Sequence, residues 1–104
     1  DRAEDAYRHA LNLRPDSPRA LLRLSTVLIR RKRYNEAQSF LESLTSKYPD
    51  YAVAWWNLGV LHRKLRQPKQ AQQAWERALQ VEPDNEHISS ALMKLSVQLE
   101  SVSE

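Results

Sequence analysis

Apolar side chains recur along this chain at intervals of three and four residues, which places them on one face of an α-helix. Two such stripes follow one another in residues 52–85: Trp55, Leu58 and His62, then Ala71, Trp75, Ala78 and Leu79. Gly59 lies beside the first stripe, where a missing side chain lets a second helix approach closely. The close approach outweighs the cost of a glycine inside a helix, which is about 1 kcal/mol. The pattern therefore predicts two helices packed as an αα-hairpin.

The same pattern returns at a fixed interval. Pro-Asp pairs begin at Pro15, Pro49 and Pro83, 34 residues apart, and each pair separates two helical patterns. Proline ends the preceding helix, while Ser17 or Asn85 can cap the following one. The interval indicates an internal repeat whose unit is one helical hairpin.

In this register, residues 1–17 match the second half of a repeat, residues 18–51 and 52–85 are full repeats, and residues 86–104 form a last helix. The matching positions of the first full repeat hold Leu21, Leu24, Ser25, Leu28, Ala37, Leu41 and Leu44. Leu21 and Ser25 differ in type from the residues one repeat later, but each keeps the same size class, large or small. The last helix carries a single apolar stripe: Ile88, Ala91, Leu92, Leu95 and Leu99. We expect six helices and no strands.

The turn inside each full repeat lacks glycine, and Lys32 and Arg66 lie there instead. Two structures fit this composition. Either the turn has another backbone conformation, or a residue with a side chain adopts the left-handed conformation at some energetic cost.

This pattern resembles the tetratricopeptide repeat, through Trp55-x-x-Leu58-Gly59-x-x-His62, then Ala71-x-x-x-Trp75-x-x-Ala78, then Pro83. The resemblance implies an all-α fold, a right-handed superhelical array of antiparallel helix pairs. Residues 1–104 would form one array, closed by residues 86–104 as a capping helix with a polar outer face. Because the chain starts in mid-repeat, we expect a fragment of a longer protein.

The first helices of proteins in that family line a concave groove that binds peptides. The resemblance therefore implies a non-catalytic protein–protein interaction module or scaffold, which binds a segment with apolar anchors and acidic flanks. The candidate groove residues are those first-helix positions that hairpin packing does not use. They are Arg19, Leu22, Arg23, Thr26, Ile29 and Arg30, then Val53, Trp56, Asn57, Val60, Arg63 and Lys64, and on the last helix His87, Ser90, Ala91 and Lys94.

Trp56 points about 100° away from Trp55 around the helix. Two interpretations remain for it. It packs against Leu22, Thr26 or the last helix inside the array, or it forms an anchor pocket for an apolar side chain of a ligand.

Some members of the family hold the acidic C-terminus of heat-shock chaperones in a carboxylate clamp of lysine, asparagine and arginine. The matching positions here are Leu22, Thr26, Asn57, His87 and Ala91. Only Asn57 fits, so we expect no clamp of that kind.

The net charge of +3 is modest but unevenly distributed. Residues 17–35 and 51–75 contain arginine and lysine and no acid. Arg30 and Lys64 are 34 residues apart, as are Lys32 and Arg66, so stacked repeats would align these and the neighbouring cations in a basic ridge along the ends of the first helices and their turns. This ridge is either a solvated edge or a surface for an acidic partner. One alternative function is therefore a nucleic-acid-binding helical repeat, and another is an accessory domain of a multidomain enzyme.

No residue pattern supports catalysis or a cofactor. The chain has one glycine and no cysteine, and His9, His62 and His87 have no partners at metal-ligand spacing. His62 occupies a packing position, so we expect it to be buried and hydrogen-bonded. We expect no enzyme, no cofactor and no metal.

The first helix lacks its hairpin partner, which leaves Tyr7, Ala10, Leu11 and Leu13 partly uncovered. A preceding repeat or a homodimer would cover this face. No apolar run approaches the about 20 residues that a membrane-spanning helix needs. A cytoplasmic location is favoured, with a signal in a preceding segment as the alternative.

Overall fold

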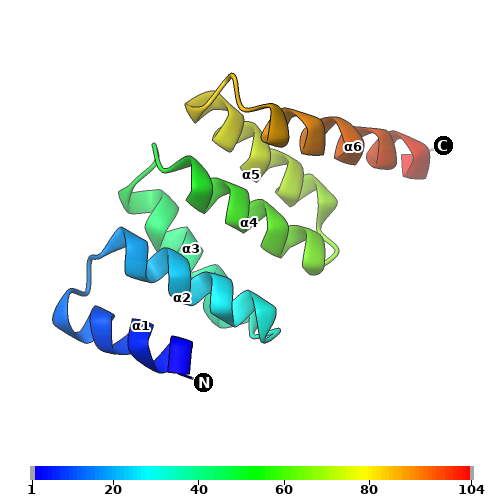
Figure 1. Ribbon diagram of the computed structural model, residues 1–104. Coiled ribbons are helices and arrows are strands. Elements are labelled where there is room, and N and C mark those ends of the chain that lie inside the picture. The colour runs from blue at the N-terminus through cyan, green and yellow to red at the C-terminus, as the bar shows by residue number, and fades with distance from the viewer. Residues whose placement is uncertain (1, 104) are drawn as a thin grey trace. The chain divides into compact units, whose positions relative to one another are not determined.

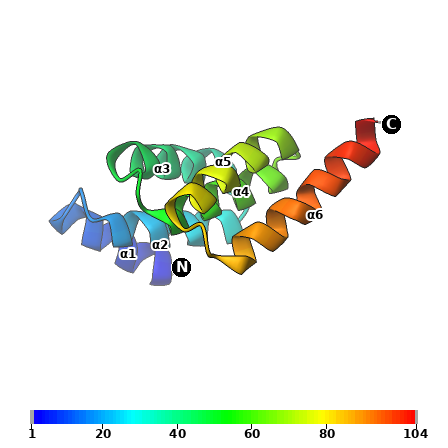
Figure 2. The same ribbon diagram turned by 90° about the horizontal axis from the view of Figure 1, so that it is seen from above.

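A computed structural model describes residues 2–103, and the side chains of residues 2–100. This range contains six helices and no strands: α1 (Arg2–Leu13), α2 (Pro18–Arg30), α3 (Tyr34–Lys47), α4 (Ala52–Lys64), α5 (Pro68–Val81) and α6 (Glu86–Ser103). Short turns connect the helices (Figures 1 and 2). The predicted all-α helical repeat is confirmed. No helix in this range is both long and apolar enough to span a membrane.

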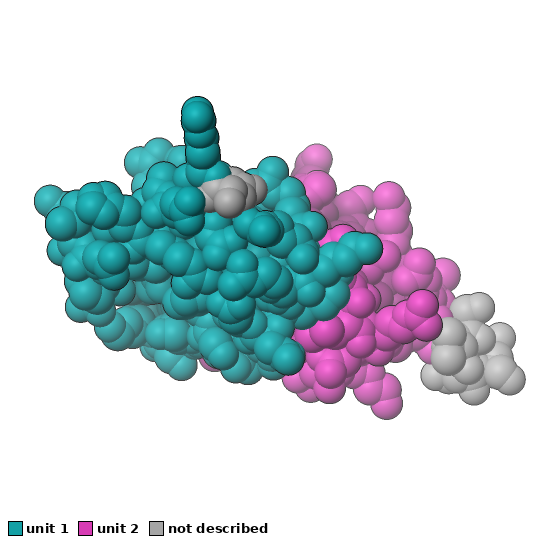
Figure 3. Space-filling model, turned by 90° about the horizontal axis from the view of Figure 1, so that it is seen from below, with its two compact units in different colours: residues 1–49 teal, residues 50–104 magenta. Residues whose placement is uncertain are grey.

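The chain forms two compact units, residues 1–49 and residues 50–104 (Figure 3). In the first unit, α1 and α3 each pack against α2. In the second unit, α4 and α6 each pack against α5. Each unit therefore contains one complete hairpin and one additional helix.

Side-chain caps begin two of the helices, as the Pro-Asp interval predicted. The Ser17 Oγ atom accepts a hydrogen bond from the Ala20 amide at 3.3 Å, and Pro18 follows at the first helical position. The Asn85 Oδ1 atom accepts a hydrogen bond from the Ile88 amide at 3.1 Å. These bonds satisfy amide groups that have no partner within the helix.

The turns inside the repeats adopt the left-handed conformation, with φ of 64° at Lys32 and 59° at Arg66. After α2, the Arg33 amide donates to the Leu28 carbonyl at 2.8 Å, and the Lys32 amide donates to the Ile29 carbonyl at 3.0 Å. The same pair of bonds closes the turn after α4, at 2.8 and 3.0 Å. This is the Schellman motif, which usually has glycine at the left-handed position. The second of the two structures expected for these turns is the one observed.

The core of the first unit is formed by the apolar stripes of α2 and α3. Its buried members include Leu21, Leu24, Leu28, Ala37, Leu41 and Leu44. Ser25 is also fully buried, and its hydroxyl donates a 2.6 Å hydrogen bond to the Leu22 carbonyl. The local bond satisfies the hydroxyl group without a partner from another helix.

The core of the second unit depends on Trp75, whose side chain is 1% exposed. Its indole Nε1 donates a 3.0 Å hydrogen bond to the Trp56 carbonyl. A Cβ atom at Gly59 would lie 2.1 Å from Trp75 Nε1 and 2.2 Å from its Cδ1. The glycine therefore allows the contact between α4 and α5, as the sequence predicted.

The predicted apolar stripe of α6 packs against α5. Ile88 and Leu95 are buried with Trp75, while Ala91, Leu92 and Leu99 are partly buried against the same core. The outer face of α6 differs from the expectation of a polar surface. Met93 and Val97, one turn apart, are 68% and 59% exposed.

The first helix has a partly uncovered apolar face. Tyr7, Ala10 and Leu11 are half-buried, and Leu13 is 71% exposed. A homodimer through this face stays a prediction, and light scattering at high concentration would test it.

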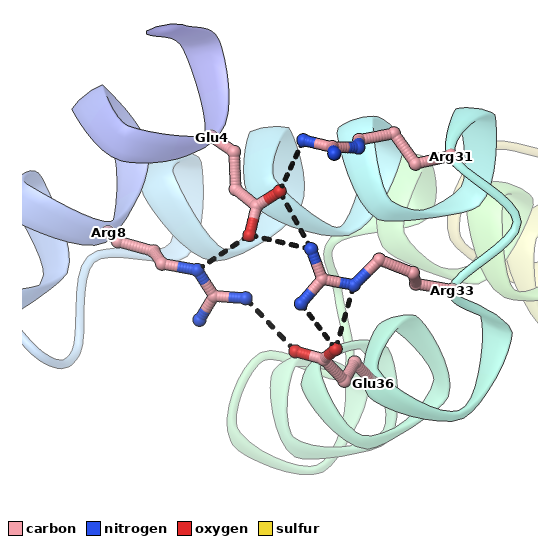
Figure 4. Close-up of polar contacts among 5 residues, drawn as sticks. All are labelled: Glu4, Arg8, Arg31, Arg33 and Glu36. Carbon is pink, nitrogen blue, oxygen red and sulfur yellow. Dashed lines mark hydrogen bonds and ion pairs between the residues drawn. The ribbon is translucent and has the colours of Figure 1, made fainter. Parts of the chain in front are cut away.

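A cluster of charged side chains holds α1 to the other helices of its unit (Figure 4). Glu4, whose side chain is 9% exposed, accepts hydrogen bonds at 2.9 Å from Arg8, Arg31 and Arg33. Glu36 accepts hydrogen bonds from Arg8 at 3.0 Å and from Arg33 at 2.6 Å. Because these residues come from α1, α3 and the turn between α2 and α3, the cluster joins three segments.

The arginines lower the pKa of both carboxyl groups. Hydrogen bonding from Arg8 is the main cause at Glu4, with Arg33 adding to it and burial opposing it. Hydrogen bonding from Arg33 and then from Arg8 lowers the pKa of Glu36. Both side chains are therefore held in their charged forms.

Gly59→Ala is expected to destabilise the fold. The new methyl group would overlap Trp75, and overpacking of this kind costs about 1–3 kcal/mol, more than the helix propensity gained. Gly59→Ala/Trp75→Leu should lose less stability than the two single changes added together, by about 1 kcal/mol. Urea unfolding followed by circular dichroism measures these differences. Ser25→Ala at the equivalent position is the control, and equal losses at the two positions would contradict the argument.

Arg66→Gly is expected to stabilise the chain. Relief of the left-handed conformation gains about 1–2 kcal/mol, and the freedom of glycine in the unfolded chain takes back about 0.5–1 kcal/mol. The melting temperature should therefore rise. Gln73→Gly, at an exposed position inside α5, is the control and should lose about 1 kcal/mol. A lower melting temperature for Arg66→Gly would show that the turn carries no such strain.

The Glu4 cluster predicts a specific loss of stability in acid. A carboxyl group with a lowered folded-state pKa contributes stability above its ordinary value of 4.5, and loses it as the pH falls through the folded-state pKa. Between about pH 6 and about pH 3, the unfolding midpoint of the wild type should fall more steeply than that of Glu4→Gln. Glu42→Gln, which removes a carboxylate outside the cluster, should follow the wild type. Parallel curves for wild type and Glu4→Gln would exclude this contribution.

Candidate functional site

The second unit contains an open groove with a volume of about 780 Å³. Its lining residues come from α4, α5 and α6: Trp56, Val60, Arg63, Lys64, Trp75, Glu86, His87, Ser90, Ala91, Lys94, Leu95 and Gln98. The repeat explains why they meet, because α5 runs back along α4 and α6 then runs in the same general direction as α4 (Figure 1). One face of α4 and one face of α6 therefore flank the same hollow.

Aromatic rings form the apolar part of the groove. Trp56 stacks on Trp75, with ring centroids 4.7 Å apart and an angle of 14° between the planes. The ring of His87, on α6, lies 4.7 Å from Trp56 at an angle of 53°. Trp56 therefore contacts the last helix, as the first interpretation of this residue expected, and it also lines the groove, while its role as an anchor for a ligand stays a prediction.

Three cations lie along the groove toward the C-terminal part of α4. Arg63 and Lys64 come from the last turn of α4, and Lys94 comes from α6. The Arg63 guanidinium lies 5.8 Å from the centroid of the Trp75 ring, in cation–π range. No ion pair among the described side chains involves any of these three cations. Their charges are therefore available to an anionic ligand.

The opposite end of the groove carries acids. Glu86, the first residue of α6, is among its lining residues. A smaller hollow of about 190 Å³ adjoins Trp56 and His87, and Glu82 and Val53 also line it. Val53 is 46% exposed there. The two ends of the site therefore differ in charge.

Eight of the residues predicted from the sequence line the groove together: Trp56, Val60, Arg63, Lys64, His87, Ser90, Ala91 and Lys94. Val53 lines the adjoining hollow, and Asn57 is not among the lining residues of either. The remaining candidates are on α2, where Arg19, Arg23 and Arg30 are exposed and Leu22 and Thr26 are half-buried. Ile29 is only 7% exposed, which leaves little of its side chain for a ligand.

Four lining residues were not predicted: Trp75, Glu86, Leu95 and Gln98. Gln98 and Glu86 continue the stripe of Ser90 and Lys94 by one turn in each direction, so helical spacing could have found both. Trp75 had already been assigned to hairpin packing. Its second role, as part of the groove lining, depends on the stacking of Trp56 on its ring. The spacing of residues along the sequence could not predict this contact between two helices.

The basic ridge differs from its prediction in the first unit. Arg31 and Arg33 bind Glu4, so acids from a neighbouring helix neutralise part of a segment that contains none. In the second unit, Leu65 and Gln67 occupy the equivalent positions. The Gln67 Oε1 atom lies 2.8 Å from Nδ1 of His62, which is 9% exposed, so the predicted buried and bonded histidine is confirmed.

Comparison with known proteins gives one family. The sequence model of the tetratricopeptide repeat family matches residues 1–61 of this chain and, a second time, residues 32–95. A curated relative, the CTR9 homolog of Arabidopsis thaliana, is 31% identical over 99 residues, which are 94% of this chain and 9% of that protein. The chain thus spans about a tenth of the length of that relative.

Solved structures agree with this match. The first such repeat domain of human RPAP3 is 25% identical, with a TM-score of 0.87 over 95% of this chain and 78% of that chain. A structure of the first repeat domain of Spaghetti (RPAP3) bound to the HSP90 peptide SRMEEVD is 24% identical, with a TM-score of 0.85 over 92% of this chain and 76% of that chain. Since the matched repeats span more than half of the sequence, the chain belongs to the tetratricopeptide repeat family, whose domains are protein-interaction modules.

Proposed function

We propose that the groove of the second unit binds a segment of another protein, as a peptide or a helix, and that the chain acts as a non-catalytic interaction module. The observation that carries this proposal is the stacked pair Trp56–Trp75 beside three cations that form no ion pair among the described side chains. An apolar side chain of the ligand would lie against Trp56. Arg63, Lys64 and Lys94 would form the basic edge of the site.

The physical properties of the groove support this proposal. Its volume of about 780 Å³ is within the range of ligand sites. Trp56 is half-buried and hydrogen-bonded through its carbonyl to Trp75, so the apolar surface is held in place before a ligand arrives. Preorganised tryptophan and arginine side chains dominate the binding energy of many interfaces.

The mode of binding would differ from that of the chaperone-peptide structure. The HSP90 peptide bound by that repeat domain ends in two glutamates, a valine and an aspartate. In this chain the expected clamp positions hold Leu22, Thr26, His87 and Ala91. The cations that line the groove lie instead at Arg63, Lys64 and Lys94, so acidic groups of the ligand would bind there.

The basic ridge supports a nucleic-acid function less well. Arg31 and Arg33 would have to exchange Glu4 and Glu36 for phosphate groups, which requires breaking a partly buried cluster. Trp56 is also already engaged, because its ring stacks on Trp75 and contacts the tilted ring of His87. A segment of another protein is therefore the ligand that the site supports better.

Trp56→Ala tests this proposal directly. Random peptides displayed on phage are selected on the immobilised chain, and the affinity of the best peptides is measured by fluorescence anisotropy. Loss of a central tryptophan anchor should weaken binding at least about 30-fold, in line with a hot-spot loss of about 2 kcal/mol or more.

Met93→Ala is the matched control, because this apolar side chain is 68% exposed and lies outside the groove. It should leave the affinity unchanged. Circular dichroism confirms that both variants are folded. Peptides that bind Trp56→Ala as tightly as the wild type would exclude the groove as the binding site.

A further inference from the structure

We infer that the groove distinguishes the two sides of its ligand, and takes a segment whose acidic residues lie on only one side of the apolar anchor. This inference rests on the proposed function and specifies its ligand. The acids would lie toward Arg63, Lys64 and Lys94. The other side of the anchor would be neutral or basic, because it would lie toward Glu82 and Glu86.

The first argument comes from α6. Glu86, Ser90 and Lys94 are four residues apart, so they share one face of the helix, and all three line the groove. An acid and a base are thus separated by about 12 Å along a single stripe. A ligand that follows this stripe meets opposite charges at its two ends.

The second argument comes from the helices that face this stripe. Along α4 the groove passes from Trp56 through Val60 to Arg63 and Lys64, so the base again lies at the C-terminal end. At the other end, Glu82 at the end of α5 lines the small hollow beside Trp56 and His87. The bases of α4 and α6 therefore lie together at one end, and Glu86 of α6 and Glu82, the residue that follows α5, lie at the other.

The spacing of Trp56 and Arg63 predicts the distance between the apolar anchor and the acid in the ligand. Trp56 and Arg63 are seven residues apart on α4, a rise of about 10 Å. In an extended ligand this distance corresponds to about three residues between the apolar anchor and the acid. In a helical ligand it corresponds to about two turns.

The test uses phage-displayed peptides with one fixed leucine and randomised residues on both sides. They are selected on the wild type, on Arg63→Glu/Lys64→Glu, on Glu82→Lys/Glu86→Lys and on Trp56→Ala as the background. Charges are counted within each selected peptide, because a peptide that binds in the reverse direction would place its acids on the other side of the leucine.

The wild type should select individual peptides with acids on one side of the leucine and none on the other. Glu82→Lys/Glu86→Lys should accept acids on both sides, and Arg63→Glu/Lys64→Glu should lose the preference for acids. For one selected peptide, reversal of the two bases should weaken binding about tenfold or more, and added salt should weaken wild-type binding.

Two outcomes separate the inference from the proposed function. Wild-type peptides that carry acids equally on both sides, or a flank preference that neither charge reversal alters, would overturn the inference while the groove remains the binding site. Enrichment on the wild type that does not exceed enrichment on Trp56→Ala would overturn the proposed function itself.

Discussion

The close contact between Gly59 and Trp75 is the constraint on which the second unit depends. An indole can lie against the α4 backbone only because residue 59 has no side chain, since even one methyl group would lie 2.1 Å from Nε1. The contact brings Trp75 within hydrogen-bonding distance of the Trp56 carbonyl and places the two rings in a stack. The floor of the groove is therefore a consequence of how the hairpin packs.

The 34-residue register shows how the same position changes along the chain. Ser25 precedes Gly59 by one repeat, and the residue equivalent to Trp75 is Leu41. Because leucine is smaller than tryptophan, the small side chain of Ser25 can be accommodated at the position equivalent to Gly59. Met93 follows Gly59 by one repeat. A helix packed on α6 as closely as α5 packs on α4 would collide with this methionine. The exposure of Met93 nevertheless departs from the polar outer face expected of a capping helix, so that role of α6 stays a prediction.

Local patterns were enough to predict the helices, the caps and the glycine contact, because each depends on residues within one hairpin. They could not decide between the two structures of the turns, since Lys32 and Arg66 adopt a conformation that their side chains disfavour. They also could not show the Glu4 cluster, whose partners Arg31 and Arg33 are 27 and 29 residues away. In the site, eight predicted residues meet in one groove, while the contribution of Trp75 required the positions of two helices.

The Glu4 cluster also explains why two basic stretches of the sequence differ in the number of cations that remain available to a ligand. Residues 17–35 and 51–75 both lack acids, and composition alone assigns them the same role. In the first unit, however, the nearest helix supplies Glu4, which binds Arg31 and Arg33. One repeat later, Leu65 and Gln67 of the second unit replace Arg31 and Arg33, and Gln38 of α3 in the first unit replaces Glu4, so the register does not repeat this cluster. Arg63, Lys64 and Lys94 form no ion pair among the described side chains, and a family resemblance that treats the repeats as equivalent would overlook this difference.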